Sequence, residues 1–167
     1  LVTFKFSINE KDNELPPGKD HWVIIGEEHE SQLITFGVQP TAIPAKPATF
    51  LPVNYEYTFR VDMSPVVQQF EKQGYYDTFD GTRVAKADFK GFYIAGGAEP
   101  LTWDFVNLGN QGLKLEREGQ SNIYKITIKL NPYNEAANQA RSWKLSWRCS
   151  WQRVKTRRLP AATLCRA

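Results

Sequence analysis

The sequence has few of the side chains that carry enzymatic and metal chemistry. It contains two cysteines, two histidines and one methionine among 167 residues. Both cysteines, Cys149 and Cys165, lie near the C-terminal end, so the residues before them offer no thiol to a metal or a disulfide. A structural zinc site needs several Cys or His ligands at short spacing. We therefore predict no bound metal and no cofactor.

The two histidines are also poor candidates for catalysis. A nucleophile activated by a general base needs a histidine beside a serine or cysteine in the fold. His21 and His29 each flank a predicted turn, and we expect both at the surface. Carboxylates are plentiful, but the sequence fixes no separation between any two of them. The sequence therefore predicts that this chain is not itself an enzyme.

Long apolar runs are absent as well. No run approaches the roughly 20 residues that a membrane-spanning helix needs, so we predict no membrane span. The chain begins at Leu1 inside a predicted strand, with no initiator Met and no signal peptide, and we expect a fragment or a processed product. Apolar residues make up 41% and aromatic residues 13% of the sequence, which predicts a packed core rather than a disordered chain.

Acidic residues are missing from the C-terminal end. Residues 141–167 hold eight Lys and Arg and no Asp or Glu, whereas residues 1–140 hold 13 Lys and Arg against 18 Asp and Glu. We divide the chain into a domain at 1–146 and a basic tail at 147–167, which we expect to be disordered or non-native. Basic residues around Trp147 and Trp151 leave contact with nucleic-acid phosphates as an alternative. The acidic domain argues against a nucleic-acid partner.

Alternation of apolar and polar residues predicts many strands in the domain at 1–146. The alternation is clearest at 55–63 and 123–130, and further strands are predicted at 1–9, 22–25, 33–38, 92–95 and 101–105. Residues 113–116 are predicted to form a hairpin with 123–130. Residues 39–52 contain four prolines, which predicts a crossing between sheets or a linker.

One short helix is predicted after the strand at 55–63. Ser64 is suited to cap its N-terminus, Pro65 to occupy its first turn and Gly74 to end it. Many short strands with one minor helix indicate an all-β fold, an antiparallel β-sandwich.

Aromatic residues outside the alternating strands are candidates for ligand binding. A flat ring covers the C–H face of a sugar while neighbouring polar groups bind its hydroxyls. Trp103 next to Asp104, and Tyr75 and Tyr76 next to Asp77, have this composition. We predict these five residues as a carbohydrate-binding site. The alternatives are a place in the core for Trp103 and ordinary packing of a loop for the two tyrosines.

The order of several short motifs resembles a known family. These motifs are FRVDM at 59–63, FYIAGG at 92–97, PLTW at 100–103 and IYKITI at 123–128. Their order is similar to that in the immunoglobulin-like "early set" sandwiches of bacterial glycan-degrading proteins. Residues 1–146 resemble the N-terminal β-domain that precedes the helical-barrel catalytic domain in six-hairpin glycosidases of gut Bacteroidetes. RSWKLS at 141–146 resembles the exit toward that barrel, and Trp103 matches one binding aromatic of starch-binding relatives.

This resemblance implies a function, a partner and a location. It implies a non-catalytic accessory module of a glycoside hydrolase, which packs against the catalytic helical-barrel domain of the parent chain and contacts a polysaccharide. The acid and base carboxylates of such enzymes lie in the barrel, so none carries over to this sequence. The implied location is the periplasm or the outer surface of a Gram-negative bacterium, or its secreted proteins. An adhesion or interaction module of a bacterial surface protein shares the sandwich and stays open as an alternative.

Overall fold

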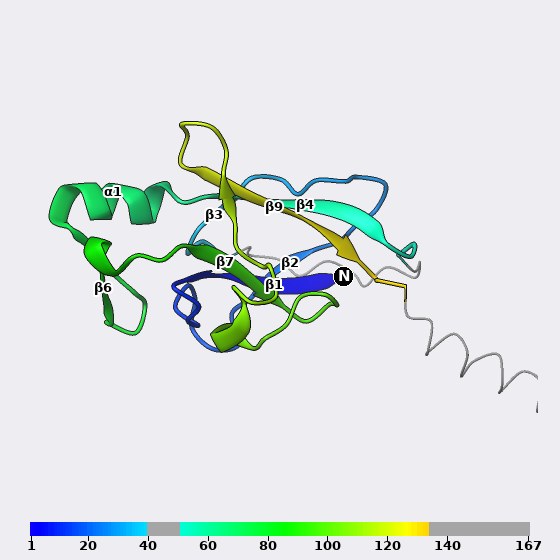
Figure 1. The fold of residues 1–167 in the computed structure, drawn as a ribbon, viewed down its shortest axis with the longest axis horizontal. Coiled ribbons are helices and arrows are strands. Elements are labelled where there is room, and N and C mark those ends of the chain that lie inside the picture. The colour runs from blue at the N-terminus through cyan, green and yellow to red at the C-terminus, as the bar shows by residue number, and fades with distance from the viewer. Residues whose placement is uncertain (40–50, 134–167) are drawn as a thin grey trace, which may run out of the picture. The chain divides into compact units, whose positions relative to one another are not determined.

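The computed structural model shown in Figure 1 describes residues 1–39 and 51–133. Residues Leu1–Pro132 form one unit, and a second unit begins at Tyr133. Most of the predicted crossing at 39–52 lies outside the described residues. The predicted exit segment at 141–146, the domain boundary at 146 and the basic tail at 147–167 lie outside them as well.

The first sheet has three antiparallel strands in the order β2–β1–β7. Their bounds are Val2–Ile8 for β1, His21–Val23 for β2 and Phe92–Gly96 for β7. The four apolar side chains of β1 are buried, as their alternation predicts. Lys5 and Ser7 on the other side of β1 are also buried, because the chain between β1 and β2 folds back over them. Alternation alone predicts a strand with one exposed face, and the cover over Lys5 and Ser7 removes that exposure.

The second sheet has four strands in the order β3–β4–β9–β8. Their bounds are Ile34–Thr35 for β3, Tyr55–Asp62 for β4, Glu116–Arg117 for β8 and Ile123–Leu130 for β9. β4 and β9 pair antiparallel along their whole length. Apolar residues of both strands are buried on one face and polar residues alternate with them on the other, as predicted. β3 pairs with β4 in parallel, so this sheet is mixed rather than purely antiparallel.

Aromatic side chains join the two sheets across a shared core. The rings of Phe4 in β1 and Phe59 in β4 meet edge to face with their centroids 4.9 Å apart. Tyr57 packs against Phe59 in the same way at 5.1 Å, and such contacts add to the burial of apolar surface. Apolar residues from both sheets belong to one buried cluster. The predicted all-β sandwich with one short helix is confirmed.

The helix α1, Ser64–Gln73, lies where the sequence predicts it. Gly74 ends it in the left-handed conformation, with φ of 81°, and its N–H bonds to the carbonyl of Phe70. The predicted cap is displaced by one residue, because Ser64 is already helical and Met63 is the N-cap. Asp62 accepts the backbone N–H of Ser64 at 2.9 Å, so a side chain before the helix satisfies a free donor. No helix in the described part of the chain is long and apolar enough to cross a membrane.

Two segments differ from their predicted structure. Tyr75 and Tyr76, expected outside the strands, lie in one, because Tyr75–Asp77 (β5) pairs with Arg83–Ala85 (β6) as a hairpin. The predicted strand at 101–105 is absent, because the chain turns there into a short 3₁₀ helix, η2, at Phe105–Asn107. A second 3₁₀ helix, η1, spans Lys86–Asp88.

Residues 113–117 connect the two sheets. The carbonyl of Leu113 accepts the N–H of Ile94 at 3.0 Å, and the N–H of Leu115 bonds to the carbonyl of Phe92 at 2.9 Å. The chain then leaves β7, and β8 pairs with β9. The predicted hairpin is confirmed, with its first strand shifted toward the turn.

Candidate functional site

Trp103 lies in the loop after β7 with its side chain exposed rather than in the core. The residue is 41% exposed. Its indole packs against the backbone of Gly97, where a Cβ would lie 3.2 Å from Nε1. Phe105 lies beside it, with ring centroids 6.4 Å apart. This loop therefore presents a flat aromatic surface on a small-residue support.

Asp104 is held by its own loop. Its Oδ2 accepts a hydrogen bond from Nδ2 of Asn107 at 2.7 Å, and its backbone N–H bonds to the hydroxyl of Thr102 at 3.1 Å. Asp104 is exposed, and its carboxylate has lone pairs beyond the one that Asn107 uses. The predicted pair of Trp103 and Asp104 is therefore adjacent and exposed.

In the second predicted cluster, Tyr75 and Asp77 lie on one face of the hairpin formed by β5 and β6, and Tyr76 lies on the other. The guanidinium of Arg83 lies 3.6 Å from the ring centre of Tyr75 and bonds to Asp77 at 2.8 Å, so one cation contacts both residues. Tyr76 points to the other face and contacts Phe36 at 6.0 Å between ring centroids. Burial raises the pKa of the Tyr76 hydroxyl above its ordinary value.

The two predicted clusters do not form one site. Gly97, on which Trp103 packs, bonds to the carbonyl of Thr3 near the N-terminus. Figure 1 shows the hairpin of β5 and β6 beside α1, at the opposite end of the sandwich from the N-terminus. The structure thus separates Trp103 and Asp104 from Tyr75, Tyr76 and Asp77.

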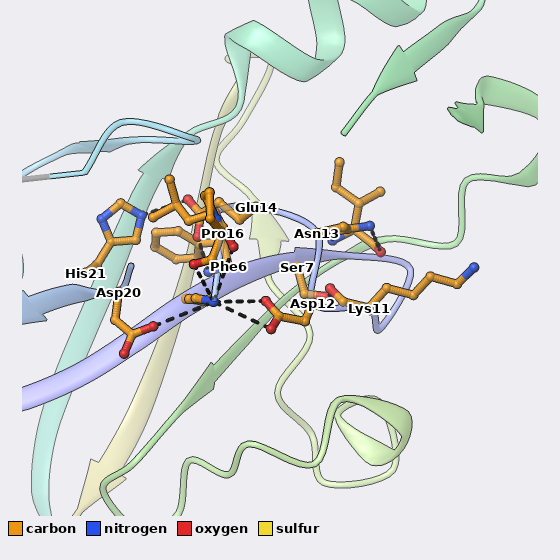
Figure 2. Close-up of polar contacts among 12 residues, drawn as sticks. Phe6, Ser7, Lys11, Asp12, Asn13, Glu14, Pro16, Asp20 and His21 are labelled. Atoms are coloured by element: carbon orange, nitrogen blue, oxygen red, sulfur yellow. Dashed lines mark hydrogen bonds and ion pairs between the residues drawn. The ribbon is translucent and has the colours of Figure 1, made fainter. Parts of the chain in front are cut away.

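Glu14 lies at the centre of a buried polar network (Figure 2). Its Oε1 accepts hydrogen bonds from Nε2 of His21 at 2.7 Å and from the N–H of Gly37 at 3.1 Å, and its Oε2 accepts the N–H of Phe6 at 2.6 Å. The side chains of Glu14 and His21 are 0% and 1% exposed. One carboxylate therefore joins β1, β2 and the turn after β3.

His21 is in the core, so its predicted place at the surface is wrong. It pairs with Phe4 in the ladder between β1 and β2, and its ring packs against the rings of Phe4 and Phe6, each at 5.6 Å. His29 is exposed, as predicted, and stacks on Tyr55 with ring centroids 4.6 Å apart. The burial of His21 could have been predicted from its position directly before Trp22, because it is the first residue of the strand β2 and not part of the turn.

Lys5 holds the chain between β1 and β2 against the first sheet. Its buried Nζ lies 3.1 Å from Asp12 and 3.6 Å from Asp20, and it donates to the carbonyls of Leu15 and Pro16. These acceptors account for the three donors of an ammonium group. The contacts assign Lys5 a structural role.

Asp77 and Asp80, two carboxylates close to Gly81 in sequence, bond to protein groups. Asp77 contacts Arg83, and Asp80 accepts the N–H of Thr82 at 3.0 Å. The hydroxyl of Thr78 also donates to Asp80 and lowers the pKa of that carboxyl. Within residues 1–39 and 51–133 no group of three or more His, Cys, Asp and Glu is placed to hold a metal ion.

A groove of about 500 Å³ lies along the side of the sandwich that carries β2 and β3. Its lining includes His21, Trp22, Glu28, Gln32, Gln39 and Tyr57. Sequence reasoning missed this groove because residues of two separate sheet edges form it. The available signal was the set of aliphatic residues at 22–25 and 33–38, of which Ile24, Leu33 and Val38 remain exposed.

Comparison with protein-family models, curated proteins and solved structures finds no match to this chain.

Proposed function

We propose that this chain is a non-catalytic accessory module of a glycoside hydrolase, and that it contacts glycan through Trp103. The observation that carries the glycan contact is the exposed indole on Gly97, with Asp104 beside it. A ring fixed in this way covers the C–H face of a sugar at little entropic cost, and the carboxylate accepts its hydroxyls.

The remaining parts of this proposal come from the resemblance. The module packs against the catalytic helical-barrel domain of its parent chain, which carries the hydrolytic carboxylates. Its location is periplasmic, on the outer surface or secreted in a Gram-negative bacterium. Tyr75 and Asp77 have no part in glycan binding in this proposal, because Arg83 contacts both of them.

Affinity electrophoresis through a panel of soluble polysaccharides tests the glycan contact. The 167-residue chain should be retarded by at least one polysaccharide, and Trp103→Ala should abolish the retardation without lowering Tm. Phe79→Ala is the matched control, because Phe79 is a similarly exposed aromatic residue, at 43%, on the hairpin at the other end of the sandwich. If Trp103→Ala migrates like the unaltered chain in every gel, Trp103 is not a glycan contact. An adhesion module would show no retardation by any polysaccharide.

A further inference from the structure

The groove between the edge strands β2 and β3 is a second concave surface, separate from Trp103. β2 is the edge strand of the first sheet and β3 the edge strand of the second. The volume of about 500 Å³ is within the range of sites that hold small ligands. Residues 21–24 line it from the first sheet, and residues 31–35 line it from the second.

A buried acceptor without a partner lies in the wall of this groove. Nε2 of His21 donates to Glu14, because the Glu14 carboxylate also receives two backbone N–H groups and acts as an acceptor. Nδ1 of His21 is then the acceptor of the ring, and it has no hydrogen-bond partner among the described residues. Figure 2 shows this nitrogen on the side of the ring that faces away from Glu14. A buried acceptor of this kind is stabilised by a hydroxyl donor.

A buried phenol lies in the same wall. Tyr57 is 1% exposed and lines the groove. Burial, with the nearby negative charge of Glu28, raises the pKa of its hydroxyl to about 12. The hydroxyl therefore keeps its proton at neutral pH and is available as both a donor and an acceptor.

The outer part of the groove combines a ring with amides and a carboxylate. Trp22 is partly exposed, and Gln32 and Glu28 are exposed beside it. Carboxamides and carboxylates are the side chains that bind vicinal hydroxyls, and the indole covers the C–H face of a sugar ring. None of the described residues that line the groove is Lys or Arg. This charge distribution favours a neutral ligand over an anionic one.

A peptide that adds a strand to β2 or β3 is the alternative ligand for this groove. Such binding draws its affinity from a row of backbone hydrogen bonds. β2 has three residues and β3 has two, and short edges offer few such bonds. Five aliphatic residues of the described chain line the groove together with the polar groups. The unpaired acceptor of His21 and the exposed side chains of Gln32 and Glu28 favour a polyhydroxylated ligand over a peptide.

We propose that the groove between β2 and β3 binds a neutral hexose unit of a glycan, with Trp22 as its ring contact and His21, Gln32 and Glu28 as its hydrogen-bonding groups. This proposal rests on the proposed function for the class of ligand, and it adds a second subsite to the one at Trp103.

NMR titration of the 167-residue chain tests this proposal. The probes are the neutral hexose oligomers maltohexaose, cellohexaose and mannohexaose, with a galacturonate hexamer as the anionic control. A neutral hexamer should shift the indole N–H of Trp22 and the side-chain amide of Gln32, and the galacturonate hexamer should not. Gln32→Ala should weaken this binding about fivefold. Gln120→Ala, an exposed glutamine in the turn between β8 and β9, should leave it unchanged.

The two proposals fail in different ways. Shifts confined to the Trp103 indole would overturn the groove subsite and leave the proposed function intact. Trp103→Ala should leave the shifts at Trp22 in place, and their loss in that variant would also overturn a separate subsite. Groove shifts caused by an extended Val-Thr heptapeptide and by no hexamer would assign the groove to peptides. Absence of shifts at both indoles with every neutral hexamer would contradict both proposals.

Discussion

Gly96 in β7 lies so close to Thr3 in β1 that a Cβ on Gly96 would be 2.7 Å from the carbonyl oxygen of Thr3. The same Cβ would lie 2.7 Å from a methyl carbon of Leu101. A backbone oxygen within a sheet cannot move aside as a flexible side chain does. This contact therefore fixes how the loop that carries Trp103 leaves the first sheet.

Gly96→Ala is expected to lower the stability of the domain by about 2 kcal/mol, because the added methyl group overpacks this junction. The corresponding fall in Tm is about 5 °C for a chain of this size. Gly26→Ala is the matched control, because a Cβ there meets nothing within 4 Å. Differential scanning calorimetry on both variants measures the difference. Equal Tm values for the two variants would show that the junction relaxes.

Glu14→Gln is expected to destabilise the domain by about 3 kcal/mol. The glutamine side chain has one oxygen where the carboxylate has two, so it cannot accept all three hydrogen bonds from Phe6, His21 and Gly37. Its NH₂ group would instead face a buried N–H donor. The measurement is urea unfolding at neutral pH. Glu27→Gln is the control, because Glu27 is an exposed carboxylate in the chain between β2 and β3. A loss below about 1 kcal/mol, the size expected for one ordinary hydrogen bond, would contradict the central role of Glu14.

Tyr57 makes the domain sensitive to alkaline pH. Burial is the main cause that raises the pKa of its hydroxyl from 10.0 to about 12 in the folded state, so folding favours the protonated form. The contribution of Tyr57 to stability is complete below pH 10 and is lost as the pH rises toward 12. By pH 11 the loss is about 1.4 kcal/mol.

Urea unfolding between pH 9 and pH 11 tests this dependence. Tyr57→Phe should lose less stability over this range than the unaltered chain, because it has no buried hydroxyl to ionise. Tyr133→Phe should behave as the unaltered chain does, since Tyr133 is 57% exposed. Parallel pH profiles for the unaltered chain and Tyr57→Phe would refute the prediction.

Gly97→Val is expected to weaken glycan retention in the proposed function while the sandwich stays folded. The indole of Trp103 packs against Gly97, and its Nε1 lies 3.2 Å from the position of a Cβ. A branched side chain there displaces the indole from its support, and a ring without a fixed position binds less well. Affinity electrophoresis and tryptophan fluorescence measure the two effects. Unchanged retention together with a changed emission spectrum would show that the position of the indole does not matter for binding.

Local sequence patterns were sufficient to predict the long strands and the helix. β4 and β9 each bury alternate residues, and this period of two is a property of the strand itself. Gly74 ends α1 as predicted, because the C-terminal position needs a positive φ and glycine adopts it without a steric cost. Short strands carried less information: β5 has three residues, and its pairing with β6 depends on the turn between them.

The candidate site was predictable only in part. Trp103 and Asp104 are adjacent in sequence and stay adjacent and exposed in the fold. Their separation from Tyr75, Tyr76 and Asp77 depends on the path of the chain from α1 to β7, and no local pattern specifies that path. The groove at β2 and β3 depends in the same way on which strands become the edges of the two sheets.

The sequence by itself determined that this chain forms a β-sandwich with one short helix, because the alternation of apolar residues selects strands and the sides that face the core. Only the tertiary structure decided which polar residues are buried and what they bind. Lys5, Glu14 and His21 belong to one short stretch of chain, yet all three are buried, because that stretch folds back over the first sheet. Burial of a polar side chain depends on what covers it, and the covering residues are brought there by the fold.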